Sequence, residues 1–276
     1  MIYVNHREGI FMLGDRIQRA RKALGLSLRD LGEQIALSHA AVKKYEDNEV
    51  TPASDILIKL AKALHVKVEY FFRPEHFTLE NIKYRRHDID MPERHLGEIN
   101  AKILDQVERR VELENLFPSS PLQVFSINSL GLPKLISEME EIENIAERVR
   151  IKWNLGFDCI PDLIDIFEEH GIKVFEIDNE KYSKLDGLYA AVNNMPIIVI
   201  GNQRPGDRQR FTLVHELGHI LLDERIATGM DMESCCNRFA GAFLLPKKSL
   251  VSILGEHRNS IEPRELSILS CWRVTA

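Results

Sequence analysis

The sequence predicts a mainly helical protein with one small β-sheet, an α+β fold divided between two modules. Short amphipathic segments separated by turn residues fill residues 15–72, which indicates a small all-helical module. Strand-like stretches at 172–177, 187–192 and 196–200 lie among helical segments in the second half of the chain. A chain of 276 residues is long enough for two domains with separate cores, and 44% hydrophobic and 28% charged residues are globular values.

The first module contains four helices with clear start and stop signals. They are expected over residues 15–24, 28–36, 39–46 and 56–64. Gly25 ends the first helix, while Ser27 and Ser38 are N-caps of the second and third. Only two residues separate the second helix from the third, which is the spacing of a helix-turn-helix. Asn48 suits a left-handed turn after the third helix.

This pattern resembles the XRE-type, lambda-repressor-like DNA-binding domain, and the resemblance covers residues 12–74. It implies that the second helix of the motif enters the major groove of an operator in double-stranded DNA. The residues expected at DNA are Ser38, His39, Ala40, Lys43, Lys44 and Arg16. Among them, His39, Ala40 and Lys43 are expected near bases, and Lys44 and Arg16 near phosphates.

Leu28 and Asn48 depart from the resemblance, because the family often has a phosphate-contacting Gln and a Gly at these positions. Acidic residues nearly balance the basic ones in this segment, so non-specific attraction to DNA is weak, and a homodimer binding two half-sites would compensate. A helix-turn-helix used only for protein contacts is the alternative interpretation.

Residues 75–137 are expected to form a helical linker between the modules. The segment is charged and helical from 92 to 117, with a partial apolar stripe of Ile103, Val107, Val111 and Leu113. Packing against one of the modules is the favoured interpretation. A dimerisation coiled coil is less favoured, because the stripe is too short for several heptads.

The second module is expected to begin near residue 138. Helices are predicted from 138 to 153 and from 161 to 170, the latter ended by Gly171. The three strand-like stretches follow and would form a small sheet.

Two histidines four residues apart stand in an apolar stretch of this module, in the run His215-Glu216-Leu217-Gly218-His219. A helix turns once in 3.6 residues, so the two imidazoles share one face and can bind one zinc ion. Glu216 falls one step around the helix, where it can take a proton from water without binding the metal. The spacing therefore predicts a zinc site with Glu216 as the catalytic base. Two structural histidines beside a solvent-facing Glu216 are the less favoured alternative.

A catalytic zinc site needs a third protein ligand and an open fourth position. Asp223 lies four residues after His219 on the same helix, and Glu224 is next to it. Glu233 is the better candidate, because it stands at the start of another predicted helix. Asn237 would share the face of Glu233 and could hydrogen-bond the outer nitrogen of a ligating histidine. A surface amide is an equally good interpretation of Asn237.

Cysteine ligands are a further alternative, because Cys235 and Cys236 stand on the same predicted helix. Adjacent side chains leave a helix in different directions, so at most one of them joins the histidines. Cys159 and Cys271 are distant in sequence, and the chain has no CxxC pair. The four thiols are therefore expected to be reduced, and a cysteine ligand is less favoured than Glu233.

The residues around the histidines resemble the ImmA/IrrE family of zinc peptidases. The resemblance is carried by residues 208–219, Glu233, Asn237, Phe239-Ala240 and Leu244-Leu245-Pro246, and upstream by Gly187, 196–200 and Asn202. It implies a zincin-like α+β domain, expected over 138–276, that holds Zn²⁺ through His215, His219 and Glu233. It also implies the cleavage of DNA-binding repressors.

The two ends of the chain carry weaker predictions. Residues 264–276 lack the further helices with which family members usually end the domain, so we expect a shortened C-terminal end and lower activity. Residues 1–11 show no periodicity, whereas Met12 leads directly into the first helix. Met12 is therefore an alternative start to Met1.

These observations predict a DNA-binding transcriptional regulator with a zinc-dependent endopeptidase domain that cleaves a repressor-type protein in cis or in trans. The free edge of the sheet would hold an extended substrate by strand addition, and Tyr189 and His170 are both open as the group that stabilises the oxyanion. The alternative is a non-catalytic repressor or antitoxin whose zincin-like domain senses a ligand or binds a partner toxin. A housekeeping peptidase is disfavoured, because it gives the first module no purpose.

The sequence also predicts where the protein acts. No apolar run approaches twenty residues, and no signal peptide is present. We therefore expect a cytoplasmic protein without membrane contact. The net charge of −6 argues against general coating of nucleic acids.

Overall fold

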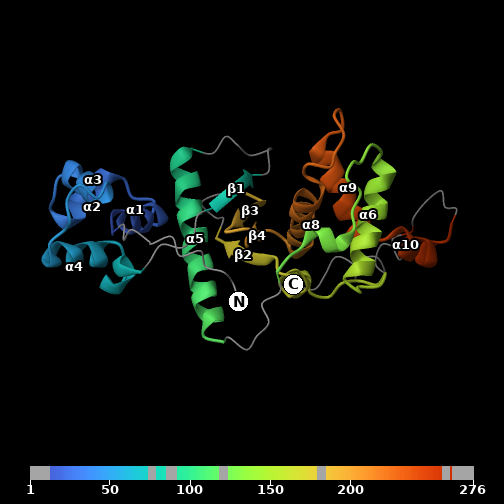
Figure 1. Cartoon of the computed structure of the whole chain (residues 1–276), viewed down its shortest axis with the longest axis horizontal. Coiled ribbons are helices and arrows are strands. Elements are labelled where there is room, and N and C mark those ends of the chain that lie inside the picture. The colour runs from blue at the N-terminus through green and yellow to red at the C-terminus, as the bar shows by residue number, and fades with distance from the viewer. Residues whose placement is uncertain are drawn as a thin grey trace. The chain divides into compact units, whose positions relative to one another are not determined.

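The structure is a computed structural model that describes residues 13–73, 79–84, 92–117, 124–178, 185–256 and 262. Contacts divide the chain into two units. The helical unit comprises residues 1–78 and 90–116, and the sheet unit comprises residues 79–89 and 117–276. Figure 1 shows the helices of the first unit and the small sheet of the second, which together confirm the predicted fold class.

The helical unit contains five α-helices and one 3-10 helix within its described residues. They are α1 (Leu13–Ala23), α2 (Leu28–Ile35), α3 (His39–Glu46), α4 (Ser54–Ala63), η1 (Val68–Phe72) and α5 (Glu93–Asn115). The helices predicted over 15–24, 28–36, 39–46 and 56–64 are confirmed, with boundaries within two residues. The hydrophobic core of the helical unit is formed by the apolar residues that recur with helical periodicity in the sequence, including Ile17, Leu31, Val42 and Leu60.

The connection between α2 and α3 depends on a close backbone approach. Ser27 caps α2 through a reciprocal pair of hydrogen bonds with Asp30, and Ser38 accepts from the amide of Ala41 at the start of α3. A Cβ atom at Gly32 would lie 2.7 Å from the carbonyl oxygen of Leu37, so the turn between the helices requires glycine there. After α3, Asn48 has the predicted left-handed conformation, with φ 57°.

Helix α5 packs against α1 of the helical unit. Its buried apolar side chains include Ile99, Ile103 and Val107, whereas Leu113 is 54% exposed. The carboxylate of Glu108 accepts from Arg16 at 2.6 Å and from Arg19 at 2.5 Å, and all three side chains are buried. The favoured interpretation of this segment, a helix packed on one of the modules, is confirmed.

The sheet unit contains a four-stranded sheet and five α-helices among its described residues. The strands are β1 (Leu79–Tyr84), β2 (Lys173–Ile177), β3 (Gly187–Val192) and β4 (Met195–Gly201). The α-helices are α6 (Met139–Lys152), α7 (Leu163–Glu169), α8 (Gly206–Leu222), α9 (Met232–Leu244) and α10 (Lys247–Leu254). A 3-10 helix, η3 (Ile127–Leu130), precedes α6. The three predicted strands and the helices of this module are confirmed. Strand β1 and helix α10 were not predicted.

The strand order is β1-β3-β4-β2. Strands β3 and β4 form an antiparallel hairpin whose two turn residues, Asn193 and Asn194, both have positive φ. Strand β2 pairs with β4 in parallel, and β1 pairs antiparallel with β3. Strand β1 therefore lies along the β3 edge, which the three predicted strands alone would leave open.

Helices α8 and α9 lie against each other, and α8 also contacts β3 and β4 (Figure 1). Gly218 permits the close approach of the two helices, because a Cβ there would meet Cys236 and Phe239 at 3.3 Å. The fully buried Arg150 of α6 donates to the carbonyl oxygens of Phe243 at 2.6 Å, Gly156 at 2.8 Å and Asp158 at 2.5 Å. The hydrogen bond to Phe243 links α6 to the C-terminal end of α9.

Two predictions about the chain ends lie outside the described residues. They concern Met12 as an alternative start and the shortened C-terminal end over 264–276. Among the helices that the structure describes, none has the length and apolar character needed to span a bilayer.

Candidate metal centre and nucleic-acid interface

Three side chains from two helices converge in the sheet unit. His215 and His219 project from α8 so that their Nε2 atoms lie 3.1 Å apart. One carboxylate oxygen of Glu233 on α9 lies 3.3 Å from Nε2 of His215, and the other lies 3.2 Å from Nε2 of His219. Tetrahedral ligands about 2.0 Å from one zinc ion stand roughly 3.3 Å from each other. The three groups therefore have the spacing of donors that share one ion.

The outer nitrogen of His215 is held by the second helix. Nδ1 of His215 lies 2.9 Å from Oδ1 of Asn237, one turn after Glu233. A protonated Nδ1 donates to that amide oxygen and leaves Nε2 with its lone pair toward the centre. Asp231 fixes the start of α9, since its side chain accepts from the amide of Ser234 at 2.9 Å.

Glu216 is fully buried between α8 and the sheet. A Cβ placed at Gly187 of β3 would lie 3.1 Å from Oε1 of Glu216 and 2.5 Å from the methyl group of Thr212. The absent side chain of Gly187 therefore makes room for both groups. This close contact places the carboxylate of Glu216 beside the backbone of β3, on the same helix as the two histidines.

Cys236 is also close to the histidines. Its sulfur can share an ion with His215 and His219, because the three donor atoms lie within 4.8 Å of one another. Burial, followed by the charges of Glu233 and Glu216, raises the pKa of the Cys236 thiol well above its usual range. A protonated thiol is a poor ligand. Cys235 points elsewhere, with its sulfur 3.9 Å from that of Met139.

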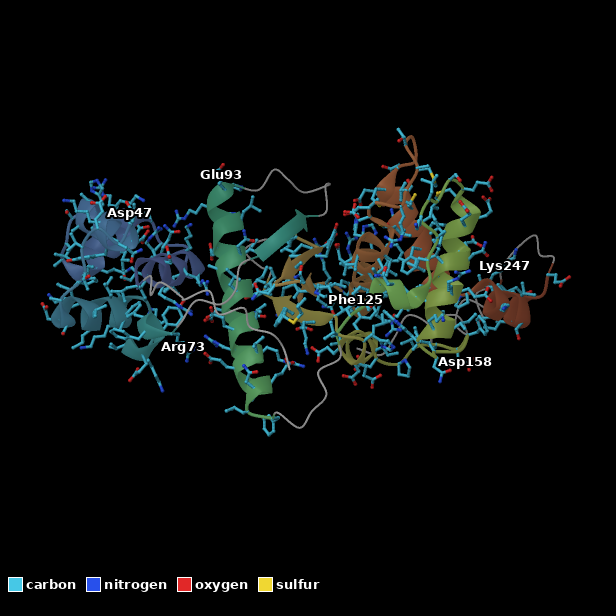
Figure 2. All side chains as sticks on the ribbon, in the orientation of Figure 1. Asp47, Arg73, Glu93, Phe125, Asp158 and Lys247 are labelled. Carbon is cyan, nitrogen blue, oxygen red and sulfur yellow. The ribbon has the colours of Figure 1, made fainter. Side chains whose placement is uncertain are left out.

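The helical unit presents a different set of residues on α3. Ser38, His39, Ala40, Lys43 and Lys44 are all exposed, and they occupy the start and one side of this helix. Figure 2 labels Asp47, which follows the last turn of α3 and accepts from Lys43 at 2.5 Å. The hydrogen bond with Asp47 raises the pKa of Lys43.

Comparisons with known proteins agree with this division. Residues 167–276 match the peptidase family described as the IrrE N-terminal-like domain, and residues 17–71 match the helix-turn-helix family. The chain joins a helix-turn-helix domain to an IrrE N-terminal-like domain.

A curated relative matches part of the chain. It is Repressor protein C2 of Salmonella phage P22, which is 30% identical over 78 residues. The match covers 28% of this chain and 36% of the repressor, so the chain spans about a third of that relative's length. No solved structure gives a significant match.

One predicted DNA contact of the helix-turn-helix domain is wrong. Arg16 was expected to contact phosphate, but its side chain is 1% exposed and is bonded to Glu108 of α5. Its Nε also donates to the carbonyl oxygen of Arg73 at 3.1 Å, and its guanidinium lies over the ring of Tyr70. The sequence of the motif contains no sign of this burial, because Glu108 is 92 residues away.

The two residues considered as stabilisers of the oxyanion, Tyr189 and His170, lie in different surroundings in the IrrE-like domain. Tyr189 of β3 stacks on His219, with ring centroids 5.5 Å apart, and its hydroxyl lies 3.4 Å from Oδ2 of Asp223. His170 instead stacks on Trp153 at 4.4 Å, and its Nδ1 lies 2.8 Å from the carbonyl oxygen of Ile166. Only Tyr189 of this pair contacts the histidines.

Asp223 and Glu224, the alternative candidates for the third metal ligand, lie at the C-terminal end of α8 and in the turn that follows it. Asp223 follows the last residue of α8 and faces Tyr189, and Glu224 has a left-handed backbone with φ 66° in the turn after the helix. Gly187, Thr212 and Tyr189 line the site and are not among the residues predicted to bind the metal. Gly187 and Thr212 belong to the residues that resemble the peptidase family, whereas no spacing in the sequence pointed to Tyr189.

Proposed function

We propose that the protein is a DNA-binding regulator whose IrrE-like domain is a zinc endopeptidase that cleaves a repressor-type protein in cis or in trans. The observation that carries this proposal is the triangle formed by His215, His219 and Glu233, with sides of 3.1–3.3 Å. Two imidazoles and one carboxylate are a common donor set of catalytic zinc, and three protein ligands leave a fourth position open.

The protein's own residues account for the proton transfers. Zinc held by the three ligands would supply Lewis acidity toward a peptide carbonyl and toward water. Glu216 lies on the ligand helix, is buried from bulk solvent, and takes the proton of the attacking water. It then gives that proton to the departing amine. Asn237 keeps His215 in the tautomer that binds metal, and Gly187 leaves room for the carboxylate of Glu216.

In this proposal, the helix-turn-helix domain binds the DNA operator. Support comes from the exposed α3 residues His39, Ala40, Lys43 and Lys44 and from the relative that is named a repressor. Specific operators of such domains contain two half-sites, so we propose a homodimer acting on double-stranded DNA in the cytoplasm. Ser38 fixes the start of α3 and lies at the same end of the helix.

The test compares the wild type with Glu216→Gln. Native mass spectrometry would record bound metal and any fragments of the chain, and cleavage of dye-quenched casein would report activity in trans. We expect one zinc ion in both proteins and cleavage products only in the wild type. The loss should be about 10²- to 10⁴-fold, which is the usual contribution of a general base. Cleavage that persists in Glu216→Gln would remove this residue from the mechanism.

A second function is favoured by one observation, the position of Cys236 beside the histidines. If Cys236 closed the site as a fourth ligand, the domain would be a binding module, such as a ligand sensor or an antitoxin that holds a partner toxin. Cys236→Ser distinguishes the two functions. The peptidase proposal expects unchanged zinc content and activity in this variant, whereas a closed site would lose zinc affinity and show no cleavage before or after the substitution.

A further inference from the structure

Strand β1 lies along the one edge of the sheet that borders the candidate metal centre. Residues Lys83 and Tyr84 are paired with Tyr189 and Leu188 of β3. Tyr189 stacks on His219, and the neighbouring Gly187 approaches Glu216. A chain in the position of β1 is therefore one strand spacing, about 4.8 Å, from backbone that touches the catalytic groups.

The pairing of β1 is the least regular in the sheet. Strands β3 and β4 pair without interruption over six residues, and β2 and β4 over five. In contrast, β1 pairs at Leu79 and Glu80, loses register, and pairs again at Lys83 and Tyr84. An interrupted ladder has fewer cooperative hydrogen bonds, so β1 is the strand that another chain displaces most easily.

The connections of β1 also differ from those of the other strands. Residues 79–89 belong to the sheet unit, whereas residues 1–78 and 90–116 belong to the helical unit. The strand is therefore attached at both ends to the helical unit that contains the helix-turn-helix domain. Strands β3 and β4 are instead joined directly to each other by a two-residue turn.

We propose that the β3 edge is the substrate groove of the peptidase and that β1 is its resident occupant. An extended peptide segment displaces residues 79–84 and pairs antiparallel with residues 188–192 before it is cleaved. The backbone amides and carbonyls of β3 supply the recognition, as in other strand additions. This inference rests on the proposed peptidase function, and it replaces the expectation of a free edge at this side of the sheet.

The first experiment locks β1 in place. Glu80 and Ala191 are paired, and antiparallel partners have Cα atoms about 4.5–5.5 Å apart, a separation that a disulfide can bridge. We expect oxidised Glu80→Cys/Ala191→Cys to lose cleavage of dye-quenched casein and to regain it after reduction. Each single cysteine variant under the same oxidising conditions is the control. Equal cleavage by the oxidised and reduced double variant would overturn the proposal.

The second experiment removes β1 without relying on catalysis. Residues 79–84 are replaced by Gly-Ser-Gly-Ser-Gly-Ser in full-length Glu216→Gln, and hydrogen exchange is measured at 187–192. The probe is a synthetic peptide with the sequence of residues 78–85, added in large excess. We expect the peptide to slow exchange in the replaced protein and to leave the unreplaced protein unchanged. Its apparent affinity should rise about tenfold or more if β1 is paired for over nine-tenths of the time.

The outcomes separate the two proposals. Protection by the peptide in the replaced protein, with neither casein cleavage nor self-cleavage by the wild type, would retain the groove and refute the peptidase function. Casein cleavage by the wild type, without protection by the peptide in a folded replaced protein, would refute the groove. Circular dichroism and zinc content establish whether the replaced protein folds, and the disulfide experiment decides the proposal if it does not.

Discussion

The helices α3 and α8 hold their functional side chains in opposite ways. On α3, the residues proposed to contact DNA are exposed, and the N-cap Ser38 is their main local constraint. On α8, His215 and Glu216 are fully buried, and residues from α9 and β3 surround them. The conformations of exposed side chains become fixed when a partner binds, whereas packing fixes the conformations of buried side chains before any partner binds. Substitutions around α8 should therefore affect folding and metal binding, and substitutions of the exposed residues on α3 should affect only DNA binding.

The largest effect is expected from Arg150→Met. This change removes a donor from three carbonyl oxygens, one of them at the end of α9, and leaves buried acceptors without that donor. We expect the free energy of unfolding to fall by about 3–5 kcal/mol, because each orphaned buried group costs roughly 1–3 kcal/mol. Urea unfolding measures the change. The exposed Arg148 on the same helix is the control, and Arg148→Met should change stability little.

Gly187→Ala should have the next largest effect. The new methyl group would lie 2.5 Å from the methyl of Thr212, so β3 or α8 must move, at a cost of about 1–3 kcal/mol. Thr212→Ser removes that methyl and should recover stability in the double variant. The contact of 3.1 Å with Glu216 remains, so casein cleavage should recover less than stability does. Full recovery of both would show that Gly187 serves packing alone.

Asn237→Ala should weaken metal binding without unfolding the domain. The amide oxygen 2.9 Å from Nδ1 of His215 orients that ring, and loss of such a partner typically costs about 10- to 100-fold in metal affinity. Competition with a zinc chelator measures the affinity. Asn237→Asp retains an acceptor oxygen and should retain most of the affinity. Equal affinity in the wild type and Asn237→Ala would show that His215 is oriented by other contacts.

The smallest change in stability is expected from Lys44→Ala on α3. An exposed lysine that contacts phosphate contributes mainly counterion release, so the salt dependence of operator affinity should lose about one unit of slope, equally for all operator sequences. Fluorescence anisotropy at several salt concentrations measures the slope. Lys62→Ala on α4 is the control for charge. A change of slope in both variants would mean that the effect is general electrostatics and that α3 has no special role.

Local patterns predicted much of this protein, because they depend on residues close in sequence. The helix-turn-helix spacing, the histidine pair of α8 and the position of Glu233 at the start of α9 all follow from helical periodicity and capping. The structure brings Glu233 within 3.3 Å of both histidines, and this convergence could be anticipated only because each helix was identified separately.

The features that sequence reasoning missed depend on distant pairings. Strand β1 is defined by its hydrogen bonds to β3, about a hundred residues later, and its own residues carry no strong alternation. The burial of Arg16 depends on Glu108 of α5. The sequence left Tyr189 and His170 both open for the oxyanion role, because the contact of Tyr189 with His219 depends on the packing of β3 beside α8 and on no spacing within the strand.

The pairing of Arg16 and Arg19 with Glu108 also determines how the chain can be divided. A fragment that ends at residue 73 would contain the entire helix-turn-helix and would still expose α1 where α5 should cover it. Two buried arginines would lose their shared carboxylate in that fragment. An isolated DNA-binding protein made from this chain therefore has to include residues 92–117. Recombination between related genes would likewise preserve this domain only when it exchanges α1 and α5 together.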